Sequence, residues 1–168
     1  MNSWIHYFNH KYIYFLISLV LFSCAESMVN TKVSTESDQP KPKQGLSGHV
    51  IFRQGQFDQQ GKLIGNGRVI GVQREVYIYE ETSFQEAEIS TGSFIKMIHT
   101  DVVDSIKSDR DGYFQLPLKP GKYSVFVKEN EQLYSPMNDD GWFMPVVIKK
   151  DSLTEVEFTI DYLAKYED

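Results

Sequence analysis

The sequence predicts an all-β fold, an antiparallel β-sandwich of about seven strands that occupies residues 46–168. Apolar and polar side chains alternate with a period of two from Leu46 onward, most regularly over 155–162. Such alternation is typical of strands with one buried face and one wet face. Clusters of Gly, Pro and Asp separate these stretches, and none of them carries a long helical stripe of apolar side chains. The pattern therefore favours short strands joined by tight turns.

The chain begins with a segment typical of an export signal. Residues 12–22 form a run of 11 uncharged, largely apolar side chains, and Lys11 precedes them. A helix needs about 20 apolar residues to span a bilayer, so this run is too short. Its length suits the apolar core of a signal peptide, and we assign residues 1–23 to one.

The end of this segment carries the only cysteine of the chain, Cys24, so no disulfide can form within the chain. Leu21, Phe22 and Ser23 precede it, and the sequence turns polar directly afterwards. This pattern resembles the lipobox of bacterial lipoproteins. The resemblance implies cleavage before Cys24, a lipid on its thiol and attachment to a membrane of the cell envelope. Under the best-known sorting rule, Ala25 in place of Asp favours the outer membrane. The alternative is an ordinary secretory signal, or a buried apolar segment, with an accidental cysteine.

Residues 24–45 are expected to form the lipidated cysteine and a flexible linker. Ser, Thr, Lys and Glu dominate the segment, and it contains no aromatic side chain. It therefore buries too little apolar area to offset the entropy of ordering. Pro40 and Pro42 favour an extended conformation, which would hold the following domain away from the membrane.

The strands of the sandwich are read from the alternation in chain order. The connection between Arg53 and Glu75 is long and contains several glycines, and the sequence leaves open whether it is a loop or a hairpin. The expected strands are 49–52, 75–80, 94–98, 104–107, 113–118, 122–127, 143–148 and 155–162.

The turns around the fifth and sixth expected strands carry a recognisable pattern. Asp111-Gly112 suits a hairpin turn and Pro120-Gly121 suits a type II turn. Together with the alternating strands between and after them, they give SD-x-DG-x-F-x-L-x-L-x-PG-x-Y-x-V-x-V over residues 108–127. This resembles the carboxypeptidase regulatory-like domain, an immunoglobulin-like or transthyretin-like β-sandwich. The resemblance implies a folding, interaction or accessory module, because such a fold by itself assigns no chemistry.

Composition and motifs argue against several function classes. The net charge of −6 is opposite in sign to the basic surface of a nucleic-acid binder. No GxSxG, HExxH, P-loop or GxGxxG motif is present, so we expect neither an enzyme nor a cofactor. His49 and His99 lie far apart in the sequence without neighbouring ligands, and we interpret them as strand residues rather than metal ligands.

Two acidic segments are weak candidates for a calcium site, since calcium prefers oxygen ligands. They contain Asp109 and Asp111 in one turn, and Asp139 and Asp140 in another. Neither has the ligand spacing of an EF-hand loop. We favour the simpler interpretation, in which these carboxylates initiate turns.

The most suggestive stretch for ligand contact is Tyr134–Pro145, where Tyr134, Trp142 and Phe143 flank an acidic loop. Such aromatics anchor contacts with glycans or proteins, although large aromatics more often close the end of a sandwich core. We therefore expect a membrane-anchored envelope lipoprotein that acts as a non-enzymatic interaction or accessory module. Its partners would be the membrane, through lipid, and other envelope proteins or glycans. The alternative is a binding protein for carbohydrate or another small ligand.

Overall fold

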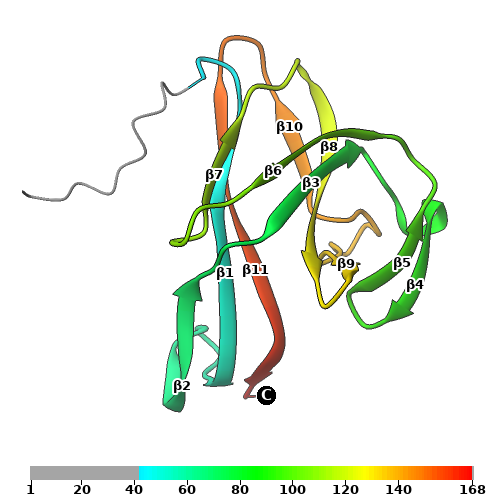
Figure 1. The fold of residues 1–168 in the computed structure, drawn as a ribbon. Helices are drawn as coiled ribbons and strands as arrows, with labels where there is room; N and C mark the ends of the chain where they lie inside the picture. The colour runs from blue at the N-terminus through cyan, green and yellow to red at the C-terminus, as the bar shows by residue number, and fades with distance from the viewer. Residues whose placement is uncertain (1–41, 168) are drawn as a thin grey trace, which may run out of the picture. The chain divides into compact units, whose positions relative to one another are not determined.

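The computed structural model describes residues 42–167, and these form a β-rich domain (Figure 1). No helix in this part of the chain is long and apolar enough to cross a membrane. A 3₁₀ turn, η2, covers Phe84–Glu86. The strands are β1 Gly45–Phe57, β2 Leu63–Gly71, β3 Glu75–Glu80, β4 Ala87–Thr91, β5 Phe94–Ile98, β6 Val102–Lys107, β7 Tyr113–Leu116, β8 Gly121–Glu129, β9 Gln132–Tyr134, β10 Pro145–Ile148 and β11 Leu153–Tyr166.

The strands form two sheets. In the four-stranded sheet the long strand β1 pairs with β11 on one side, and with β7 and then β2 along the other. The seven-stranded sheet runs β4-β5-β9-β8-β3-β6, and β10 pairs with the first half of β8. Every strand pair is antiparallel except β1 with β11, which is parallel.

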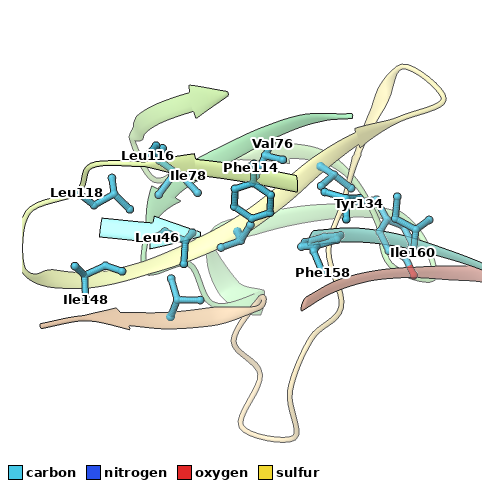
Figure 2. Packing of buried hydrophobic residues seen from close by; sticks show 14 of the residues in the cluster. Leu46, Val76, Ile78, Phe114, Leu116, Leu118, Tyr134, Ile148, Phe158 and Ile160 are labelled. Carbon is cyan, nitrogen blue, oxygen red and sulfur yellow. The ribbon is translucent and has the colours of Figure 1, made fainter. Parts of the chain in front are cut away.

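The main core lies between the two sheets. Side chains of β1, β7 and β11 meet those of β3, β8 and β10, as the close view shows (Figure 2). Burying this apolar surface is the main favourable contribution to folding. The buried members are Leu46, Val50, Phe52, Val76, Ile78, Phe114, Leu116, Leu118, Val125, Val127, Tyr134, Val146, Ile148, Phe158 and Ile160.

A second, smaller cluster covers the outer face of the seven-stranded sheet. Phe126 lies on β8 between Val125 and Val127, so its side chain points away from the main core. It is nevertheless fully buried, against Phe143 from the loop before β10 and Ile95 from β5. The outer face of this sheet is therefore partly covered as well.

Three loops share one five-residue turn built on an Asp or Asn. In each, the first residue's amide donates to the fifth residue's carbonyl, and the glycine at position four donates back to the first residue's carbonyl. The glycines have φ between 76° and 85°, a region that other residues enter at a cost. The first side chain accepts the fifth amide, which fixes the loop. The turns are 58–62, 109–113 and 138–142.

The predicted fold class is confirmed: the described residues form an all-β sandwich. The structure has eleven strands rather than about seven, because β2, β4 and β9 carry little alternation. The open connection after Arg53 is a hairpin, since β2 pairs antiparallel with the far half of β1. Strand β1 begins at Gly45, one residue before the expected start of the domain. The residues of the expected signal peptide and most of the expected linker lie outside the described part.

Candidate functional site

Two of the three aromatics proposed for ligand contact are core residues. Tyr134 is 1% exposed, and its ring meets Phe94 edge-on at 5.2 Å. Its hydroxyl donates to the Asp161 carboxylate at 2.8 Å. Burial, together with this hydrogen bond, raises the pKa of the Tyr134 phenol. Phe143 is also 1% exposed, inside the outer cluster. Neither ring has an exposed face that a ligand could reach. The expectation of direct ligand contact is therefore wrong for Tyr134 and Phe143.

Trp142, the third aromatic, does reach the surface. It is half-buried and lines an open groove of about 560 Å³. This volume falls in the range of small-molecule and peptide sites. The groove lies between η2 and the loop that precedes β10. Its lining residues are Ser83, Phe84, Gln85, Met137, Asp140, Gly141 and Trp142.

Hydrogen bonds hold the two walls of this groove together. The Phe84 amide donates to the Gly141 carbonyl at 2.8 Å, and Ser83 forms an isolated β-bridge with Trp142. Below them, the Phe143 amide donates to the Thr82 carbonyl at 3.1 Å. Because these hydrogen bonds join the two walls through the backbone, they fix the backbone positions of Phe84 and Trp142 relative to each other.

A capping box positions Phe84. The backbone amide and the hydroxyl of Ser83 both donate to one oxygen of the Glu86 carboxylate, at 2.9 and 2.8 Å. These donors stabilise the ionised carboxylate and hold the pKa of Glu86 below its usual value. The turn therefore presents the Phe84 ring outward, where it is 53% exposed.

The groove is apolar inside and acidic at its rim. Met137 lies in the same wall as Trp142, lines the groove with Phe84, and is 47% exposed. Asp139 and Asp140 are exposed on the adjoining turn, and neither forms an ion pair with any residue of the described part. Exposed large side chains gathered in one place mark interaction surfaces more often than isolated ones do.

The weak calcium candidates do not come together as a site. Asp109 accepts the amides of Asp111 and Tyr113, at 2.9 and 2.8 Å, and so builds its own turn. Asp139 and Asp140 belong to a different turn. Within residues 42–167 no three His, Cys, Asp or Glu side chains gather closely enough to hold a metal ion.

The histidines also lie apart from one another. His49 packs against the Tyr113 ring at 5.2 Å, and His99 approaches Glu88 at 3.9 Å. His49 lies within β1, as expected of a strand residue, whereas His99 lies one residue beyond the end of β5. Cys24, the proposed lipid attachment point, lies outside the described residues.

The sequence reasoning missed Phe84 and Met137. Phe84 is the only aromatic side chain between Tyr79 and Phe94, in a stretch rich in Glu, Ser and Thr. A single aromatic side chain in such a polar segment indicates an exposed residue that can contact a partner. Met137 lies inside the stretch that drew attention, but sulfur side chains are usually assigned to the core.

Comparison of the chain with protein-family models, with curated proteins and with solved structures gave no match.

Proposed function

We propose that this protein is a lipid-anchored, non-enzymatic module of the bacterial cell envelope that binds a protein partner through the groove between η2 and the 137–142 loop. The observation that carries the proposal is the exposure of Phe84, Met137 and Trp142 around one groove on a hydrogen-bonded frame. Trp and other aromatics are the residues that most often dominate binding energy at protein interfaces.

The charge around the groove favours one kind of partner. Asp140 lines the groove and Asp139 is its exposed neighbour in the chain; neither forms an ion pair within residues 42–167, and the whole chain carries a net charge of −6. A segment with an apolar anchor flanked by Lys or Arg would fill the groove and meet these carboxylates. Complementary charge of this kind increases the association rate and selects among partners.

A carbohydrate is the second occupant that the sequence suggested for this region. With Tyr134 and Phe143 buried, the groove offers the rings of Phe84 and Trp142. Its lining is mainly apolar, and Ser83 already donates to Glu86. Sugar hydroxyls would find few partners here, and unpaired polar groups cost affinity. The groove therefore suits an apolar protein anchor better than a sugar.

Site-specific photo-crosslinking in a Gram-negative host tests the groove. A benzoyl-phenylalanine replaces Phe84 in one strain and Val147 in another; Val147 is 49% exposed on β10 and serves as the matched control. We expect an adduct from position 84 and none from 147. Mass spectrometry should place Lys or Arg beside the crosslinked partner residue. The double variant Asp139→Lys, Asp140→Lys should reduce the adduct several-fold. Equal adducts at both positions, or no effect of charge reversal, would contradict the proposal.

The anchor is tested separately, so that the two parts of the proposal can fail independently. Cells fed a labelled fatty acid should incorporate it into the wild-type chain and not into Cys24→Ser. The variant should also move from the membrane fraction to the soluble fraction, because the two or three acyl chains on Cys24 provide the attachment. A wild-type chain that takes up no label would refute the anchor and leave the groove experiment interpretable.

A further inference from the structure

A second hollow lies on the outer face of the seven-stranded sheet and shares no lining residue with the groove. Its volume is about 470 Å³, again within the range of ligand sites. It is more polar than the groove and is bounded by strands on both sides. The lining residues are Tyr77, Tyr79, Ile95, Lys96, Lys128, Glu131, Gln132 and Leu133.

Two tyrosine rings on β3 line this hollow. Tyr77 and Tyr79 alternate with the fully buried Val76 and Ile78, so both rings project from the outer face. Tyr79 stands edge-on against the buried Phe126, with ring centroids 5.3 Å apart and planes at 78°. Tyr77 lies opposite Phe126 in the strand register. The outer cluster therefore holds these rings in place before any ligand arrives.

Polar side chains surround the rings, and their charges are matched in pairs. Lys128 forms an ion pair with Glu131 at 3.0 Å, and Lys96 approaches Glu88 at 3.6 Å. Gln132 adds an amide that can donate and accept. The Tyr77 hydroxyl donates to the Glu75 carboxylate at 3.0 Å. The rim thus offers hydrogen-bond donors and acceptors, and each of its two lysines is already paired with a carboxylate.

We propose that this hollow binds a neutral oligosaccharide, with a sugar ring lying on Tyr77 and Tyr79 and its hydroxyls bonded to Lys96, Lys128, Glu131 and Gln132. A sugar ring has an apolar C–H face that packs on an aromatic ring and a polar edge that both donates and accepts. The hollow presents both kinds of surface side by side.

Other ligand classes fit the hollow less well. An anion would have to compete with Glu131 and Glu88 for the two lysines. An apolar peptide would bury the polar rim and leave its donors and acceptors without partners, which weakens binding. A polyol satisfies the rim without either cost.

Binding is tested with the full chain in an amine-oxide detergent, which carries no sugar headgroup. Saturation-transfer NMR and calorimetry are run against cello-, malto-, xylo-, manno- and chitin-oligosaccharides, with oligogalacturonate as the anionic arm. We expect at least one neutral oligosaccharide to bind, with saturation strongest at its C–H protons. Tyr77→Ala should weaken that binding about tenfold, whereas Tyr77→Phe should retain it.

The matched control is Trp142→Ala, which alters the groove and should leave sugar binding unchanged. Thermal melting confirms that each variant is folded, and Tyr77 is suited to this test because its ring is only half-buried. The proposal is overturned if no neutral oligosaccharide binds or if only oligogalacturonate binds. It is also overturned if Trp142→Ala abolishes binding while Tyr77→Ala does not.

Discussion

The inner face of the seven-stranded sheet packs against the four-stranded sheet. Its outer face packs against β5, at the end of the same sheet, and against the loop before β10. Fifteen buried residues form the inner cluster and three form the outer one. The outer face carries the half-exposed Tyr77 and Tyr79 and adjoins both hollows. The comparison shows that the inner face contributes most of the buried apolar surface, while the outer face keeps aromatic side chains partly exposed.

The largest expected effect compares one phenylalanine from each face. Phe158 in the inner cluster and Phe126 in the outer cluster are both fully buried. Phe158→Ala should lower the free energy of unfolding by about 3–5 kcal/mol. Phe126→Ala should cost less, about 2–3 kcal/mol, because half-exposed neighbours can settle into the space or admit water. Chemical denaturation measures both, and equal losses would contradict the distinction between the two faces.

The shared five-residue turn allows a sharper comparison between two glycines. Gly112 and Gly141 have φ of 85° and 82°, so the cost of a left-handed alanine is the same, about 1–2 kcal/mol. A Cβ at Gly112 would lie 2.4 Å from the Val50 carbonyl, whereas nothing lies within 4 Å at Gly141. Gly112→Ala should therefore destabilise by about 1–3 kcal/mol more than Gly141→Ala, as measured by denaturation. Equal losses of stability in the two variants would contradict this prediction. They would show that the backbone near Val50 can shift to accommodate the added Cβ.

Alkaline pH tests the burial of the Tyr134 phenol. Tyr134→Phe removes a hydrogen bond to a carboxylate and should cost about 1–2 kcal/mol at pH 8. Because burial raises the pKa of Tyr134, the unfolded chain releases its phenol proton first as pH rises above about 10. Stability should fall over this range, and the fall should be shallower for Tyr134→Phe. Parallel curves for the two proteins would argue that Tyr134 is accessible.

The smallest expected effect is local to the groove. The pKa of Glu86 lies below its usual value, so the capping box is fully formed above pH 4.5 and is lost as pH falls through that lowered pKa. The Ser83 amide resonance should therefore shift on acidification in wild type and remain fixed in Glu86→Gln. An unchanged resonance in the wild-type protein would mean that the carboxylate does not accept the Ser83 amide in solution.

Alternation in the sequence was sufficient to predict the all-β class and several strands, including β3 and β5 at their observed bounds. It failed for β2, where Gly65, Gly67 and Gly71 interrupt the pattern and most side chains are exposed. It also carries no information on strand direction. The parallel pairing of β1 with β11 could not be read from it, because alternation reports which side chains share a face and nothing about the neighbouring strand.

The candidate site was only partly predictable for a related reason. Tyr134, Trp142 and Phe143 share one segment, yet two are buried and one lines the groove. Their exposure depends on which tertiary partners reach them: Asp161 for Tyr134, and Phe126 for Phe143. The facing wall comes from η2, more than fifty residues earlier in the chain, and only the folded structure brings Phe84 beside Gly141.

The parallel pairing of β1 with β11 also has a mechanical consequence. The chain enters the domain at Gly45, directly after the residues expected to form the tether, and β1 is flanked by other strands along its length. A pull on that entry point acts along β1, at right angles to much of its hydrogen bonding. The ladders must then yield together in shear, rather than peel open one bond at a time. In the lipid-anchored protein that we propose, this arrangement would transmit load from the membrane to a bound partner without unravelling from the first strand.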